Sequence, residues 1–122
     1  MISFRPRLID HEKTAALRSH PLWLKWRLRL PGWQLFVVKH LRGRCIRKHQ
    51  TITVPSWAWY EPAGYHLCYL AHEISHAVSG SQKHDKAFYD VFKVTCPSRL
   101  QHFELRYKPR NAARNGIKER AS

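Results

Sequence analysis

The segment from Tyr65 to Ser79 constrains the fold of this chain more than any other. Its apolar residues recur at spacings of three and four, the period of one face of an α-helix, at Leu67, Leu70, Ile74, Ala77 and Val78. Gly80 follows, and glycine commonly ends a helix. We therefore predict an amphipathic helix here, which must bury its apolar face against other elements of the fold.

The same helix carries His72-Glu73-Ile74-Ser75-His76, which is an H-E-x-x-H pattern. Residues four apart lie on one helix face, so His72 and His76 can present two imidazoles to one metal ion, with Glu73 beside them as general base. The chain has nine histidines, and chance placement gives this pattern roughly 0.03 times. The pattern therefore predicts a metal site rather than histidines that only face solvent.

A catalytic zinc site needs a third protein ligand and one open position. His84 comes shortly after the break at Gly80 and can supply that ligand. The predicted site thus holds one Zn²⁺ ion on His72, His76 and His84. For His84 the alternative is a surface loop histidine. Asp85 can either orient a ligand or, as is commoner for Asp, cap a helix that runs to about Val94.

The segment HEISHAVSGSQKHDKAF resembles the core of the SprT-like and WLM-domain zinc metallopeptidases. In that family a third histidine opens the next helix in an H-G/D-x-x-F context, which corresponds here to His84-Asp85-Lys86-Ala87-Phe88. The upstream run RGRCIRKHQTITVPSWAW is similar to the hairpin and strand before the active-site helix, so the resemblance covers residues 33–97. It implies a zincin-like fold, the same three ligands, Glu73 as base, and proteolysis of DNA-associated or DNA-crosslinked proteins.

Around the helix we expect a small α+β fold with about three strands, over residues 33–40, 44–48 and 51–54. The short turns between these segments favour a small meander, in a sheet that is either antiparallel or mixed. In the third strand two threonines alternate with Ile52 and Val54, which predicts an element buried on one face only.

Two further helices are predicted before the sheet. Asp10 can cap the first, which ends near Ser19. Residues 22–30 fit a period of two as well as a period of four. Pro21 in front of them favours the helix, because proline is accommodated at the first helical position.

Charge points to a polyanionic partner. The chain carries 22 Lys and Arg against 8 Asp and Glu, a formal net charge of +14, which attracts nucleic acid. We expect single-stranded or non-specific DNA to be held by Arg42, Arg44, Arg47 and Lys48, and its bases to stack on Trp57 and Trp59. Charged residues on a solvated face and tryptophans in the core are the alternative.

Residues 1–105 are predicted to form a single metallopeptidase domain, and residues 106–122 a basic, flexible tail. The three cysteines include no C-x-x-C pair, so neither a disulfide framework nor the zinc ribbon of many SprT-like proteins is expected. No segment has the pattern of a membrane span or of a signal peptide. We therefore expect a cytoplasmic monomer, associated with the nucleoid when it binds DNA.

Two other functions fit parts of the pattern. Zinc-dependent endoribonucleases use three histidines at H-x3-H-x5-H, but here seven residues separate the last two histidines and Glu73 has no counterpart in those enzymes. A non-catalytic, zinc-stabilised nucleic-acid-binding module would not need Glu73 either. Glu73 therefore favours the peptidase.

Overall fold

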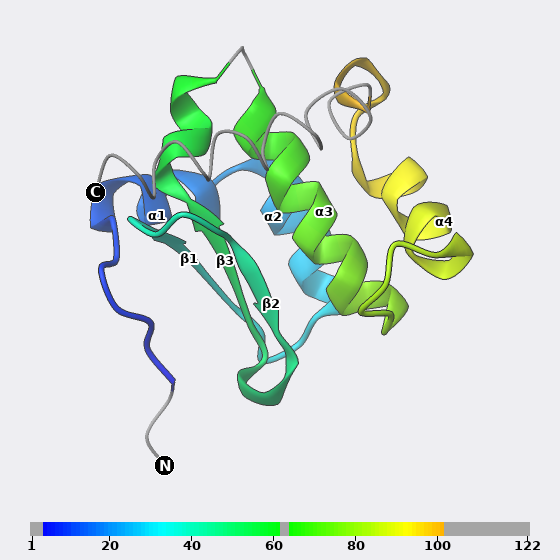
Figure 1. Ribbon diagram of the computed structural model, residues 1–122, viewed down its shortest axis with the longest axis horizontal. Coiled ribbons are helices and arrows are strands. Elements are labelled where there is room, and N and C mark those ends of the chain that lie inside the picture. Colours follow the sequence, from blue (N-terminus) through cyan, green and yellow to red (C-terminus); the bar gives the residue numbers. More distant parts are fainter. Residues whose placement is uncertain (1–3, 62–63, 102–122) are drawn as a thin grey trace.

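The computed structural model describes residues 4–61 and 64–101, and within them the chain is an α+β fold (Figure 1). The helices are α1 (His11–Arg18), α2 (Pro21–Trp26), α3 (Tyr65–Ser79) and α4 (Lys86–Thr95). The strands are β1 (Gln34–Val38), β2 (Arg44–Ile46) and β3 (Thr51–Pro55). The expected α+β class and three strands are confirmed, while the tail predicted for residues 106–122 lies outside the described residues.

The sheet is mixed, one of the two kinds expected, but its strands do not form the expected meander. Its strand order is β1-β3-β2, with β3 parallel to β1 and antiparallel to β2. The chain returns from β2 to insert β3 in the middle of the sheet, beside β1. The turn residues between the strands do not determine this order, because it depends on contacts between strands that are distant in the sequence.

Strand β3 is buried on both faces, contrary to the prediction that it is half-buried. Thr51 is 0% and Thr53 is 3% exposed. Burial of a hydroxyl is tolerated when it is hydrogen-bonded. The Thr51 hydroxyl donates to the His49 carbonyl at 2.9 Å, and the Thr53 hydroxyl accepts from the Arg44 backbone N–H at 2.9 Å.

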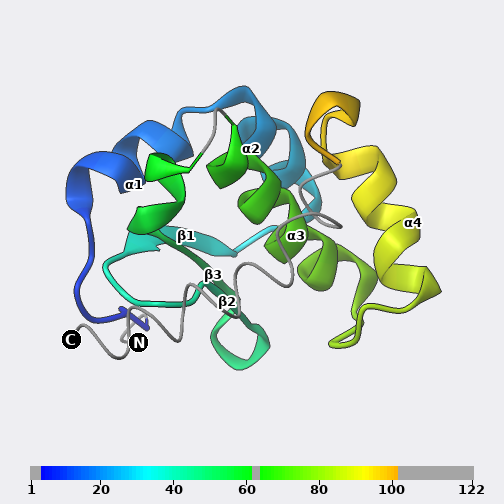
Figure 2. The same ribbon diagram turned by 45° about the horizontal axis from the view of Figure 1, so that its top comes forward.

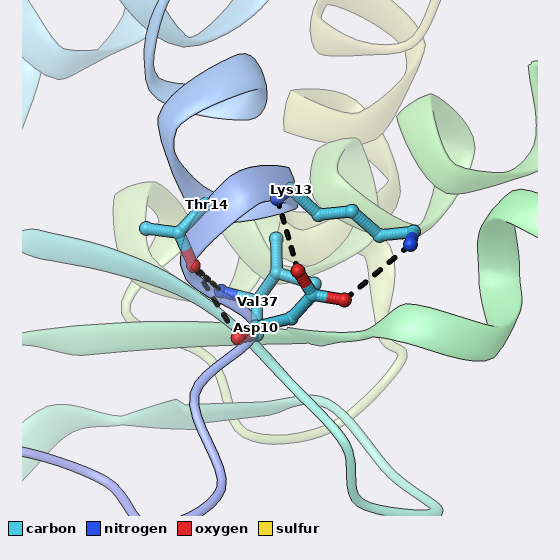
Figure 3. A network of polar contacts seen from close by, with 4 residues as sticks. All are labelled: Asp10, Lys13, Thr14 and Val37. Atoms are coloured by element: carbon cyan, nitrogen blue, oxygen red, sulfur yellow. Dashed lines mark hydrogen bonds and ion pairs between the residues drawn. The ribbon is translucent and has the colours of Figure 1, made fainter.

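Helix α1 covers the outer edge of β1 (Figure 3). Asp10 caps the helix as predicted, accepting a hydrogen bond from the Lys13 backbone N–H at 3.1 Å. The Thr14 hydroxyl accepts from the Val37 N–H at 2.8 Å and donates to the Val37 carbonyl at 3.3 Å. These contacts satisfy backbone groups that an edge strand otherwise leaves open.

Residues 22–30 are helical, as the position of Pro21 predicted. Pro21 is the first residue of α2, and a 3-10 turn at Arg27–Arg29 continues it. Trp23 and Trp26 point into the core and are 5% and 4% exposed. The period of two in this segment therefore reflects the alternation of leucines and basic residues, not a strand.

Helix α3 is the centre of the core. It packs on β2 and β3, touches α2, and has α4 along its side away from the sheet (Figure 2). Its apolar face meets the sheet residues Leu35, Val37, Ile52 and Val54 in one buried cluster. Gly80, with φ of 77°, ends α3 in the left-handed conformation that glycine adopts without strain. The predicted helix and its end are both confirmed.

Candidate metal centre

Helix α3 presents His72 at its middle and His76 one turn later, close to its C-terminal end. His76 is 7% exposed and His72 is half-buried, whereas His84 is exposed in the segment that joins α3 to α4. The reversal of the chain after Gly80 brings His84 back against the two helical histidines. The three predicted ligands therefore come together although eleven residues separate the first from the last.

Two pairs of imidazole nitrogens lie near the separation that one small ion requires. His72 Nε2 lies 3.2 Å from His76 Nε2 and 3.1 Å from His84 Nε2. All three ligand atoms fall within 4.8 Å of one another. Two nitrogens bound tetrahedrally to zinc would lie about 3.3 Å apart. These three histidines can hold a metal ion.

The orientation of His76 is fixed by a hydrogen bond from its other ring nitrogen. Its Nδ1 lies 2.8 Å from the Ser81 carbonyl oxygen. A carbonyl can only accept, so Nδ1 carries the proton, and in a neutral imidazole Nε2 then has a free lone pair. Such a partner is typical of metal-binding histidines and makes the ligand more basic. Because Ser81 acts through its backbone, sequence reasoning did not single it out.

An aromatic wall closes one side of the cluster. The Phe88 ring is fully buried, and its centroid lies 4.9, 4.6 and 5.0 Å from those of His72, His76 and His84. An apolar surface of this kind limits access of water to a metal centre. The sequence identified Phe88 only as an apolar residue of the following helix and as part of the H-D-x-x-F run.

Asp85 caps helix α4, which was the commoner of its two expected roles. Its carboxylate accepts from the Phe88 backbone N–H at 3.1 Å and from the Ser81 hydroxyl at 2.9 Å. These two hydrogen bonds, the first being the stronger influence, hold the pKa of Asp85 below its ordinary value. Asp85 thereby fixes the start of α4 directly after His84.

Glu73 is on the buried side of α3, with 6% exposure. Its carboxylate lies near enough to Cys45 in β2 for the two groups to interact electrostatically. Burial, and then the negative charge of Glu73, raise the pKa of Cys45 to about 11, against an opposing effect of Arg47. The catalytic role of Glu73 remains a prediction.

The predicted nucleic-acid residues are not all exposed. Arg42, Arg44, Arg47 and Lys48 lie at the surface. Trp57 does not: it is 7% exposed, and its indole N–H donates to the Leu41 carbonyl at 2.8 Å. The expectation that Trp57 forms a stacking platform is therefore wrong, because residues 56–60 coil into a 3-10 helix that turns this ring under Tyr65.

Trp59 is half-buried and stacks on His66, with ring centroids 4.5 Å apart. Arg47 has a second role that the sequence did not indicate. Its guanidinium donates to the His76 carbonyl at 2.5 Å. Arg47 therefore contacts the C-terminal end of α3 beside the three histidines, which we call the metal cluster. A cation there is favourable because the last carbonyls of a helix carry partial negative charge.

Comparison of the chain with protein-family models, curated proteins and solved structures gives no match. The assignment of function therefore depends on the chemistry of the site. Within residues 4–61 and 64–101, no helix has the length and hydropathy that crossing a bilayer requires.

Proposed function

We propose that this protein is a zinc-dependent metallopeptidase of the SprT-like type, with a zincin-like fold. The observation that carries the proposal is the convergence of three imidazole nitrogens on one point, with a glutamate in the helix that supplies two of them. Three histidines that leave one position open are a ligand set for catalytic zinc, and they suit zinc better than oxygen-preferring Mg²⁺ or Ca²⁺.

The residues around the site have separable tasks in this proposal. His72, His76 and His84 would hold the zinc ion, which would supply Lewis-acid activation of a water and of the scissile carbonyl. Glu73 would act as the general base, taking a proton from the attacking water and returning it to the leaving amine. The Ser81 carbonyl keeps His76 in the ligating tautomer, and Phe88 excludes water from one side of the cluster.

A peptide substrate is favoured by the place of β2. Among the described strands β2 forms one edge of the sheet, and it lies against α3. An extended peptide can pair with an exposed sheet edge through its backbone. A chain held along β2 would run past the helix that carries Glu73 and the histidines.

The proposed substrates are proteins bound or crosslinked to DNA. This part is supported by the net charge of +14 and by the exposed basic residues of β2 and of the turn that follows it, Arg44, Arg47 and Lys48. Arg47 links these residues to the metal cluster, since it contacts the His76 carbonyl. Nucleic acid on this surface would bring attached protein near the site.

The test is cleavage of casein and histone by zinc-loaded protein, with and without single-stranded DNA. Glu73→Gln should keep one bound zinc and lose activity by about 10²- to 10⁴-fold, because it removes the general base but no ligand. Glu12→Gln, at an exposed position on α1, is the matched control and should cleave normally.

Bound zinc without cleavage of either protein would overturn the peptidase proposal. Cleavage of RNA by the same preparation would then favour the endoribonuclease alternative. Equal activity of Glu73→Gln and the original protein would show that another group acts as base.

A further inference from the structure

A second site lies between the N-terminal arm, residues 4–8, and the chain that leaves β1. It is a cavity of about 590 Å³. Five basic side chains line it: Arg5, Arg7, His40, Arg42 and Arg44. Only Arg42 and Arg44 were selected from the sequence, since the arm is far from them along the chain.

The arm is fixed in place by hydrogen bonds from the sheet region. The Gln34 side-chain amide donates to the Phe4 carbonyl at 3.1 Å, and the Lys39 backbone N–H donates to the Leu8 carbonyl at 2.8 Å. His40 Nε2 lies 3.1 Å from the Arg7 carbonyl, which can only accept, so the ring donates there. Arg5 and Arg7 are therefore presented from an anchored backbone, which lowers the entropy lost when a ligand binds.

The positive charge in this pocket is not compensated within the described part of the chain. No carboxylate lines the cavity, and none of its four arginines forms an ion pair with a described residue. All four are exposed. Nearby, burial and then the positive charge of Arg5 lower the pKa of Arg18. Like charges gathered in this way favour an anionic ligand.

The rest of the lining restricts which anion fits. Val38, Leu41 and Ile46 give the cavity an apolar portion. A small inorganic anion would leave that portion without contacts, whereas a nucleotide combines a phosphate for the arginines with a flat base for the apolar surface.

A series of contacts connects the pocket with the end of α3 that carries His76. Phe4 stacks on His49 with ring centroids 4.2 Å apart. His49 ends the 3-10 turn Arg47–His49, and Arg47 contacts the His76 carbonyl. Basic residues thus extend from the pocket, across this turn, to the metal-binding end of α3.

We propose that this pocket binds a nucleotide unit of single-stranded nucleic acid, with its phosphates on the arginines of the arm and of β2, and that the strand continues over Arg47 and Lys48 toward the metal cluster. This deepens the proposed function by placing its nucleic-acid partner. Phosphate contacts of this kind bind without reading sequence.

The experiment measures binding of a fluorescent oligothymidylate strand over a range of salt concentrations. It uses the full chain carrying Glu73→Gln, so binding is observed without turnover and its failure is distinct from failure of peptidase activity. Two pocket variants are compared, Arg5→Gln with Arg7→Gln and Arg42→Gln with Arg44→Gln. Lys93→Gln with Arg99→Gln is the charge-matched control, since both residues are exposed and neither lines the pocket.

Each pocket variant should weaken binding about tenfold or more, because each loses charged hydrogen bonds. The salt dependence should fall by roughly 0.7 in logarithmic slope for each lost phosphate contact. The control should bind like the parent. Circular dichroism verifies that each variant is folded. If one of the two double-substitution variants unfolds, the other still tests the pocket.

Three results would overturn the inference. The first is equal loss of affinity in the control, which would mean a diffuse charge effect. The second is thymidine 5′-monophosphate binding as tightly as the strand, which would make the ligand a free nucleotide. The third is binding to phosphatidylserine vesicles but not to the strand.

Discussion

The pKa of Cys45 is affected by the charged residues Glu73 and Arg47. It is half-buried in β2, between the charges of Glu73 and Arg47, and its pKa is raised to about 11. Burial is the largest cause, because a thiolate loses hydration, and the carboxylate of Glu73 adds repulsion. The neutral thiol is therefore the form present at neutral pH.

We predict that Cys45 resists alkylation in the folded protein. With a pKa of about 11, its thiolate fraction at pH 8 is roughly a hundredfold or more below that of an ordinary cysteine. Peptide-resolved mass spectrometry after iodoacetamide treatment measures this, and reactivity should rise as the pH approaches 11.

Glu73→Gln should lower the pKa of Cys45 and speed the alkylation, since it removes one of the two causes. The urea-unfolded chain gives the reference rate. A folded Cys45 that reacts at pH 8 as fast as the unfolded one would contradict the prediction.

The contact between α1 and β1 includes two hydrogen bonds made by one side chain, that of Thr14. Thr14 is 5% exposed, and its hydroxyl holds both the N–H and the carbonyl of Val37 (Figure 3). The Asp10 backbone N–H also donates to that carbonyl at 2.8 Å. The Val37 N–H, in contrast, donates to the Thr14 hydroxyl. It is therefore the group that loses its partner when the hydroxyl is removed.

We predict that Thr14→Val lowers the free energy of unfolding by about 1–3 kcal/mol, because it keeps the shape of the side chain but leaves a buried N–H unsatisfied. Urea denaturation gives the value. Thr14→Ser retains the hydroxyl and is the matched control, with a smaller loss. Equal stability of the Val and Ser variants would show that water or another group replaces the hydroxyl.

For the whole molecule, a metal ion would connect two helices. His72 and His76 belong to α3, and His84 directly precedes the cap of α4. The helices already share a core that includes Phe88 and Phe92. The fold should therefore persist without metal, with a lower stability.

We predict that chelation by EDTA lowers the melting temperature while the far-ultraviolet circular dichroism of the native state is kept. At a free zinc concentration a thousand times its dissociation constant, the ion stabilises the folded state by about 4 kcal/mol. His84→Ala should abolish this response and His11→Ala, at an exposed position on α1, should not. Complete unfolding on chelation would mean that the hydrophobic core cannot hold the fold together without the metal ion.

The local features of this protein follow from the sequence by itself. The helix at 65–79, its end at Gly80, the caps at Asp10 and Asp85, and the side-by-side placement of His72 and His76 depend on residues within a few positions of one another. Helical geometry fixes such relations wherever the segment lies in the fold. The spacing alone could therefore indicate the candidate site.

The tertiary structure decided the relations between distant segments. The central place of β3, the burial of Trp57, the contact of Arg47 with His76, and the pocket shared by the N-terminal arm and β2 all join residues far apart in sequence. Each depends on which partners compete for the same space and the same hydrogen-bonding groups, and a local pattern does not specify that competition. For this reason the three candidate ligands could be predicted from the sequence, while the surroundings that orient them could not.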